Sequence, residues 1–362
     1  MKRHRWLVMG AVLAVLVLLV YIQFRTLNSF QWSTLAHTFD SIRWPQLVLA
    51  TALIYAAYVT RAFRWSIFLR PTKPASPAQM VPAQFIGFTA VAILGRLGEF
   101  VRPYLVARRQ QVTLTSQLAV YTVERVSDLL AAAAIIAVTL SISKSVRNLP
   151  YHEQFRRAGY FGIVAALLLG LVAVAIRVAG PKIADLSSRA VGTVSSKLAL
   201  GVHEKILAFS YGLDAIAGWS ELLLVLFYSF LTWGLIALAY VVVVHSFTVP
   251  ELASIPAAQT ILLMAGSLFG SFAQLPAIGG GSQVAIIYVL TSVLRVGPEA
   301  ATACALTLYV VTFLTVIPAG LAFARVEHVS LRHIAKQSGS AEENLQSSAA
   351  ESDGPRKAHS LP

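Results

Sequence analysis

The sequence predicts an all-α protein that crosses a membrane several times. The chain of 362 residues is 57% hydrophobic and 12% charged, and its mean hydropathy is +0.69. An ordinary soluble domain carries about a quarter charged residues. Several apolar runs exceed the roughly 18 residues that indicate a transmembrane helix. Two others are broken by glycine and proline at similar places in the two halves of the chain. We therefore expect about six complete transmembrane helices, two broken or re-entrant helical regions, and an inverted repeat that relates the two halves.

The elements follow in chain order within one integral membrane domain, residues 1–336. Complete spans are expected at 6–24, 47–69, 116–142, 160–176, 221–245 and 300–324, and broken or re-entrant regions at 81–109 and 260–296. Residues 181–217 place apolar side chains at steps of three and four, which predicts amphipathic helices on the cytoplasmic membrane surface. The segment 337–362 is rich in Ser, Ala, Glu and Gly and predicts a disordered cytoplasmic tail.

Basic residues set the expected orientation. Lys2, Arg3 and Arg5 precede the first apolar run, and further basic residues follow the last, so both termini are expected in the cytoplasm. The first run is long for a signal peptide, and no cleavage site of small residues follows it. We interpret it as an uncleaved helix in the cytoplasmic membrane, the inner membrane of a bacterium. The basic loop 144–157 departs from this trend because it is expected outside.

Three arginines close the second span. Arg61, Arg64 and Arg70 lie in or just after its last turns. Long cationic side chains near the end of a membrane helix commonly reach for the interface. We expect these arginines to act as topology anchors at the cytoplasmic surface rather than as substrate ligands.

The two broken regions point to a binding site. Glycines and a proline interrupt the first at Gly87, Gly95, Gly98 and Pro103, and Pro276 and the run 279–281 interrupt the second. Non-helical backbone inside a membrane is tolerated only where it is buried in protein or lines a cavity. Glu99 and Glu124 stand 25 positions apart, and Gln283 and Tyr309 stand 26 apart. Interrupted segments at matching places are typical of a transporter's substrate site.

Charge at membrane depth defines the candidate site. Its residues are Arg96, Glu99, Arg102, Glu124, Arg125 and Asp128, joined by Gly279, Gly280 and Gln283 of the second broken region. Guanidinium groups bind phosphate oxygens well. The carboxylates are expected to counter the arginines, bind an amine headgroup or take up a proton. The alternative is a buried ion network that only fixes two helices.

Other chemistry has little support in the sequence. The formal net charge of +13 comes from residues that flank apolar segments, which favours contact with anionic lipid over nucleic acid. Cys304 is the only cysteine, so neither an intrachain disulfide nor a cysteine metal site can form. His328 and His333 are interpreted as interfacial residues. We expect no metal, no cofactor and no catalytic residue.

Three motifs resemble one family. Residues 95–103, GRLGEFVRP, and 123–128, VERVSD, resemble the signature of the lysylphosphatidylglycerol synthase transmembrane-region family of flippase-like proteins. Residues 275–281, LPAIGGG, resemble its later Pro-x-x-Gly-Gly segment. The resemblance covers roughly residues 5–330 and implies an integral membrane protein that moves or modifies lipid headgroups. Gln283 departs from the family, which often has Glu there, and Tyr309 stands where a basic residue is common.

The resemblance favours translocation over synthesis. The chain continues about 35 residues past its last expected span, too few for the soluble aminoacyl-transferase domain of the best-known members. We expect a translocase for a lipid or lipid-linked headgroup rather than an enzyme, with an anionic phospholipid or a polyprenyl-phosphate lipid as partner. A homo-oligomer or a separate transferase partner remains open.

Two alternatives remain. A polyprenyl-phosphate-dependent membrane glycosyltransferase, or an accessory protein to one, needs clustered external carboxylates. The external loops offer only Asp40, Glu153 and Glu251, each alone. A small-solute secondary transporter would share the expected architecture.

Overall fold

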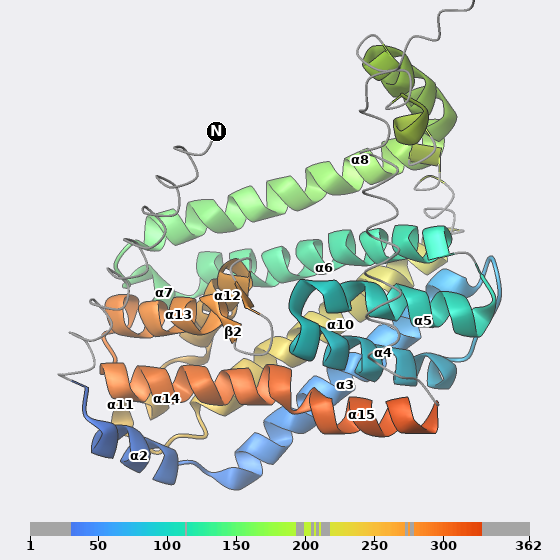
Figure 1. The fold of residues 1–362 in the computed structure, drawn as a ribbon. Helices are drawn as coiled ribbons and strands as arrows, with labels where there is room; N and C mark the ends of the chain where they lie inside the picture. Colours follow the sequence, from blue (N-terminus) through green and yellow to red (C-terminus); the bar gives the residue numbers. More distant parts are fainter. Residues whose placement is uncertain are drawn as a thin grey trace, which may run out of the picture.

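The computed structural model describes residues 30–327 apart from 113, 193–198, 204–205, 208–209, 211–217, 272–273 and 276–278. These residues form a bundle of helices, which confirms the all-α fold class (Figure 1). The expected first span 6–24, part of the amphipathic segment 181–217 and the tail 337–362 lie outside the described residues.

The described helices in chain order are α2 (Trp32–Asp40), α3 (Trp44–Leu69), α4 (Pro77–Leu94), the 3₁₀ turn η1 (Gly95–Phe100), α5 (Val101–Gln110), α6 (Leu114–Ile142), α7 (Lys144–Arg147), α8 (His152–Gly192), α10 (Trp219–Val244), α11 (Pro250–Ala253), α12 (Ala257–Gly270), α13 (Gly281–Tyr288), the π-helix η3 (Val289–Val293), α14 (Pro298–Tyr309), the π-helix η4 (Val310–Leu314) and α15 (Val316–Val326).

Six stretches of helix in the described part are long and apolar enough to cross a membrane. They are Trp44–Leu69, Pro77–Leu94, Ser116–Ile142, His152–Val172, Trp219–Val244 and Pro298–Val326. The protein is therefore a multi-pass membrane protein. The stretch Pro77–Leu94 is the first arm of a region that the sequence marks as broken, and the other five overlap expected spans.

Helices α3 and α10 pack against each other along their length as an antiparallel pair. The hydroxyls of Thr60 and Thr232 lie 2.7 Å apart, and the rings of Phe63 and Tyr228 stack at 5.6 Å. A step toward the C-terminus of α3, from Thr60 to Phe63, is thus a step toward the N-terminus of α10, from Thr232 to Tyr228, so the two helices run antiparallel. Thr60 and Thr232 are small enough to let the two backbones approach closely at that point, as is common between membrane helices.

The first broken region folds back on itself as hairpin 1, made of α4, η1 and α5. A Cβ on Gly98 would lie 2.3 Å from the carbonyl of Ala90, and one on Gly87 would lie 2.7 Å from Cβ of Arg102. Only glycine fits at these two contacts. The turn between the arms therefore closes tightly enough to set α5 against α4.

The second broken region also turns back, as hairpin 2. It consists of α12, the two-residue strands β1 (Gln274–Leu275) and β2 (Gly279–Gly280), and α13 with η3. A Cβ on Gly270 would lie 2.1 Å from the carbonyl oxygen of Gly281, so the arms cross in close contact. Both regions are thus helical hairpins, and their re-entrance within a membrane stays a prediction.

The open ends of the two hairpins lie at opposite ends of the bundle. Arg109, at the end of hairpin 1, pairs with Glu327 beyond α15 at 2.7 Å. The amide of Gly297, just past hairpin 2, donates to Glu251 of α11 at 2.8 Å. Together with the antiparallel α3 and α10, this arrangement matches an inverted repeat.

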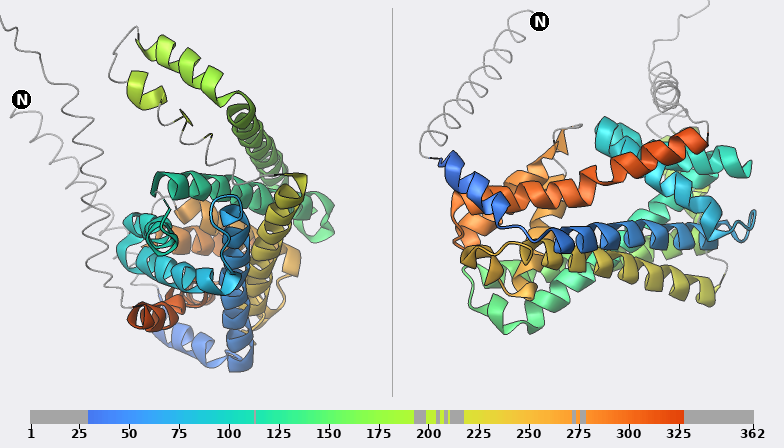
Figure 2. Two further views of the ribbon diagram at one scale, coloured as in Figure 1. Left: turned by 90° about the vertical axis from the view of Figure 1, so that its right-hand side faces the viewer. Right: turned by 90° about the horizontal axis from the view of Figure 1, so that it is seen from below.

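Helix α8 lies on the outside of the bundle. It packs along α6 and then continues past it, as the views of Figures 1 and 2 agree. Ala179 has non-helical backbone angles two residues before Pro181, so the helix is kinked there. The expected span 160–176 precedes the kink, and the start of the amphipathic segment follows it.

Candidate functional site

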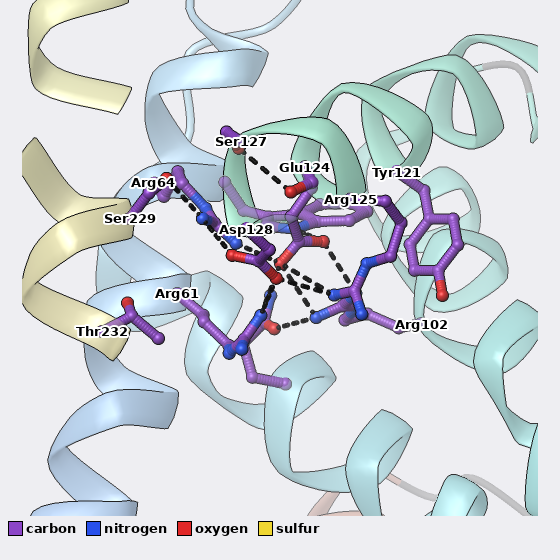
Figure 3. Close-up of polar contacts among 12 residues, drawn as sticks. Arg61, Arg64, Arg102, Tyr121, Glu124, Arg125, Ser127, Asp128, Ser229 and Thr232 are labelled. Atoms are coloured by element: carbon purple, nitrogen blue, oxygen red, sulfur yellow. Dashed lines mark hydrogen bonds and ion pairs between the residues drawn. The ribbon is translucent and has the colours of Figure 1, made fainter. Parts of the chain in front are cut away.

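Four arginines surround two acids inside the bundle, and we call these six residues the charged cluster (Figure 3). Glu124 and Asp128 lie four residues apart on one face of α6, with 0% and 4% of their surface exposed. The arginines come from three helices: Arg61 and Arg64 from α3, Arg102 from α5, and Arg125 from α6 itself. Glu124 lies about 15 Å along α6 from its first residue, well inside the apolar span.

Glu124 has a partner on every side. Its Oε1 accepts from Nη2 of Arg64 at 2.6 Å and from Nη1 of both Arg61 and Arg102 at 3.2 Å. Its Oε2 pairs with Nη2 of Arg102 at 2.7 Å and accepts from the indole Nε1 of Trp65 at 2.9 Å. A carboxylate with so many donors is compensated for its burial.

Asp128 binds both arginines of α3, and one of them, Arg64, links the cluster to α10. Its Oδ1 accepts from Nη1 of Arg64 at 2.6 Å, and its Oδ2 accepts from Nη1 of Arg61 at 2.7 Å. The same Nη1 of Arg64 lies 2.6 Å from the hydroxyl of Ser229 on α10. The cluster therefore joins α3, α6 and α10.

The expected interfacial position of Arg61 and Arg64 is wrong. Their side chains are buried, at 4% and 0% exposed, whereas Arg70 one turn and a half later is exposed. The physical reason is that arginines three apart share the face of α3 that meets two acids four apart on α6. The spacing can be read from the sequence, but the packing that brings the two faces together cannot.

Arg102 is held in place on all sides. Its Nη1 donates to Oε1 of Gln84 at 2.9 Å, and its guanidinium lies 5.1–5.3 Å from the ring centres of Trp65, Phe88 and Tyr121. Cation–π contacts of this kind are strongest where water is excluded. With its pair to Glu124, Arg102 has its charge and its donors occupied by the protein.

Arg125 differs from the other three arginines. Its side chain is 41% exposed, and it lies 3.1 Å from Asp128 and 3.7 Å from Glu124. Its guanidinium rests over the ring of Tyr121 at 4.9 Å. Its Nε and Nη2 atoms are buried and make no hydrogen bond to any described residue. Both contacts to the acids run through Nη2, so Arg125 is held by charge and not by a directed hydrogen bond to a described residue.

A cavity of about 60 Å³ lies beside Arg125, between hairpin 1 and α6. Its lining consists of Gly87, Phe88, Val91, Gly98, Glu99, Arg102, Tyr121 and Arg125. One water needs about 10–15 Å³ of such volume, so the cavity has room for a few waters or one small polar group. Because Arg125 forms part of its wall, a ligand in the cavity would meet this side chain.

The structure brings five of the expected site residues together. Glu99, Arg102, Glu124, Arg125 and Asp128 lie in the charged cluster or the cavity beside it. Glu99 accepts a short hydrogen bond from the hydroxyl of Tyr121. The backbone of Arg96 lies in η1, and its side chain is outside the described residues.

The residues expected from the second broken region have local partners in hairpin 2. Gly279 and Gly280 form β2, and Gly280 has a φ of +113°, which favours glycine. Oε1 of Gln283 accepts from the amide of Gly280 at 2.7 Å and from the hydroxyl of Ser282 at 3.0 Å. Gln283 thus caps the start of α13, a task that a Glu performs equally well.

Sequence reasoning missed Tyr121 as well as the two arginines of α3. Tyr121 precedes Glu124, Arg125 and Asp128 by three, four and seven residues, so all four share one face of α6. That spacing was readable in the sequence. By contrast, Trp65, Gln84 and Ser229 join the site only through helix packing.

The family model described as Lysylphosphatidylglycerol synthase TM region matches residues 7–320. The chain belongs to this family. Membership in the lysylphosphatidylglycerol synthase TM region family confirms the resemblance of the sequence motifs and fits a membrane-lipid-related role. The match spans hairpin 1, the charged cluster and hairpin 2. A comparison with curated proteins and one with solved structures each found no match.

Proposed function

We propose that this protein translocates a lipid or lipid-linked headgroup across the cytoplasmic membrane, and that Arg125 binds the headgroup phosphate. The observation that carries the proposal is a partly exposed arginine on the wall of a cavity within the membrane-spanning part of the bundle. Guanidinium is suited to phosphate because its planar donors match two oxygens at once.

The charge balance of the site also favours an anion. Four guanidiniums lie within ion-pair distance of only two carboxylates, Glu124 and Asp128. Glu99 adds one further carboxylate at the cavity, and the described arginines still outnumber the described acids. Surplus positive charge inside a membrane protein is costly, and an anionic ligand offsets it.

Arg125 is a better ligand for substrate than the other arginines of the cluster. Arg61 and Arg64 are buried against both acids, and Arg102 is enclosed by three aromatic rings and Gln84. Moving any of them would break contacts that hold helices together. Arg125 can turn toward the cavity at lower cost because its own contacts are longer and its side chain is partly exposed.

Two of the three acids expected in the external loops have local partners, which disfavours the glycosyltransferase alternative. Glu153 pairs with Arg156 at 2.8 Å, and Glu251 accepts from the amide of Gly297 at 2.8 Å. Asp40 is exposed and lies 3.9 Å from the exposed His37, with no second carboxylate in the same helix. A sugar-transferring site needs a carboxylate free to act as a base.

The test is lipid movement in vesicles that contain purified protein. A fluorescent phosphatidylglycerol is placed in one leaflet, and its appearance in the other is followed by chemical quenching. We expect wild type to equilibrate the leaflets, and Arg125→Gln to match vesicles without protein. Arg70→Gln is the matched control because Arg70 is exposed outside the cluster; it should retain the wild-type rate.

Two results would count against the proposal. Wild-type vesicles that move the lipid no faster than empty vesicles contradict translocation of this lipid class. Uptake of radiolabelled inorganic phosphate without lipid movement would instead make the protein a small-solute transporter.

A further inference from the structure

We propose that Tyr121 is a positioning residue that keeps the Glu99 carboxylate off Arg125, so that the guanidinium stays available to a phosphate group. This inference rests on the proposed function, since it concerns the same cavity. It adds a residue that sequence reasoning did not select and gives the acid at the hairpin turn a defined role.

Tyr121 contacts both charged walls of the cavity at once. Its hydroxyl donates to Glu99 on η1, and the face of its ring lies 4.9 Å from the guanidinium of Arg125 on α6. The ring also lies 5.3 Å from Arg102. One side chain therefore fixes the acid through its hydroxyl and supports the cation through its ring.

The two groups that Tyr121 separates would otherwise attract each other. Glu99 and Arg125 line the same cavity, and a carboxylate and a guanidinium attract strongly where water is scarce. Carboxylate and phosphate engage a guanidinium with the same pairs of oxygens. A Glu99 carboxylate released onto Arg125 would occupy the site as an internal anion and exclude the phosphate.

The position of the Glu99 carboxylate depends on its side chain, because the backbone of hairpin 1 is fixed at this point. Gly98, next to Glu99, packs against the carbonyl of Ala90, so the turn itself is fixed. Rotation of the Glu99 side chain is the remaining freedom. The Tyr121 hydroxyl directs that rotation away from Arg125 by offering a charge-assisted hydrogen bond.

The experiment measures binding by full-length protein in nanodiscs of neutral phosphatidylcholine. Short-chain phosphatidylglycerol is titrated in one arm and inorganic phosphate in another, which separates a lipid headgroup from free phosphate as the source of the anion. The variants are Tyr121→Phe, Glu99→Gln and the double variant. Phe keeps the ring under Arg125 and removes only the hydroxyl.

We expect Tyr121→Phe to weaken phosphatidylglycerol binding about tenfold, the change that one charge-assisted hydrogen bond can produce. Glu99→Gln should bind at least as tightly as wild type, because the competing charge is gone. The double variant should return to the affinity of Glu99→Gln. That rescue is the decisive result, since a purely structural loss at Tyr121 would persist when Glu99 is neutralised.

Other outcomes overturn the inference. A double variant as weak as Tyr121→Phe would show that Tyr121 acts by packing, and wild-type affinity in Tyr121→Phe would show that the hydroxyl is not needed. Should Tyr121→Phe fail to fold, weaker binding by Glu99→Gln alone would still overturn it, because Glu99 would then be helping the ligand. Unchanged binding by Arg125→Gln would instead remove the proposed phosphate site itself.

Discussion

Nη2 of Arg64 lies 2.6 Å from Oε1 of Glu124, and neither side chain has any exposed surface. The pair joins α3 to α6, and Nη1 of Arg64 extends the link to Ser229 on α10. Its geometry is that of a clamp between three long helices. The charged cluster thus has two parts, a closed part around Arg64 and an open part around Arg125.

The closed part should control stability. In Arg64→Gln the shorter, uncharged side chain no longer pairs with Asp128 or reaches Glu124. We expect the free energy of unfolding to fall by about 3–5 kcal/mol, the usual cost of breaking a buried ion pair. Thermal unfolding in detergent measures it. Arg125→Gln should lose much less, because that side chain is 41% exposed. Comparable losses in the two variants would contradict the division of the cluster.

The sequence was sufficient for the fold class and for four of the six residues of this cluster. Apolar run lengths predicted the membrane helices, and glycines and proline predicted the two interrupted regions. Glu124, Arg125 and Asp128 stood out because charge within an apolar span is rare. Arg61 and Arg64 were misplaced because, near a helix end, an anchor and a buried partner look alike in sequence. Their partners on α6 lie about 60 residues away, and only packing brings them together.

The glycines of hairpin 1 show a second limit of the sequence. Gly87 and Gly98 were readable as breaks, yet α4 continues as a helix through Gly87. Gly87 is needed because Cβ of Arg102 lies against it, a contact that depends on the turn closing. For the second broken region, a part in the substrate site stays a prediction for Gly279, Gly280 and Gln283.

Gly98→Ala should open hairpin 1. The added Cβ would lie 2.3 Å from the backbone of Ala90 and Val91, which cannot move aside as a side chain can. We expect a destabilisation of about 1–3 kcal/mol or more, with loss of ligand binding in the cavity. Gly234→Ala on α10 is the matched control, since nothing lies within 4 Å of its added Cβ. Equal unfolding midpoints for the two variants would show that the turn is looser than described.

The orientation in the membrane can be tested at two loops. Thr72 follows α3 and Asn148 follows α7. From the positions of the basic residues we expect Thr72 in the cytoplasm and Asn148 outside. Single cysteines are placed at the two positions, with Cys304 replaced. Asn148→Cys should react with an impermeant thiol reagent in intact cells, whereas Thr72→Cys should react only in broken cells. Labelling of Thr72→Cys in intact cells would invert or overturn the topology.

Helix α14 and helix α15 are joined by a bend that α3 supports. The π-helix η4 carries one extra residue per turn, shown by the bond from the amide of Thr315 to the carbonyl of Val310 at 3.0 Å. Tyr55 of α3 donates its hydroxyl to the carbonyl of Thr315 at 2.5 Å. Pro318 adds a second break, because it has no amide proton to continue the helix.

The bend separates parts of the protein that belong to different hairpins. On one side, α15 is bound to α4: Thr89 donates to the carbonyl of Val316 at 3.1 Å, and Gly320 packs against Thr89 and Phe85. On the other side, α14 packs against α13 of hairpin 2. A change of angle at η4 would therefore move hairpin 1 relative to hairpin 2.

Deleting Val310 should stiffen this joint. A π-helix behaves as an α-helix with one inserted residue, so the deletion restores a continuous α-helix across η4. Spin labels at Ile93 on α4 and Leu306 on α14, both on exposed side chains, report the distance between the two parts. We expect a broad distance distribution in wild type and a single narrow one in the deletion, with slower lipid movement in vesicles.

Val310→Ala, which keeps the residue count, is the control and should resemble wild type. Equally broad distributions in the deletion and wild type would mean that η4 is not the joint.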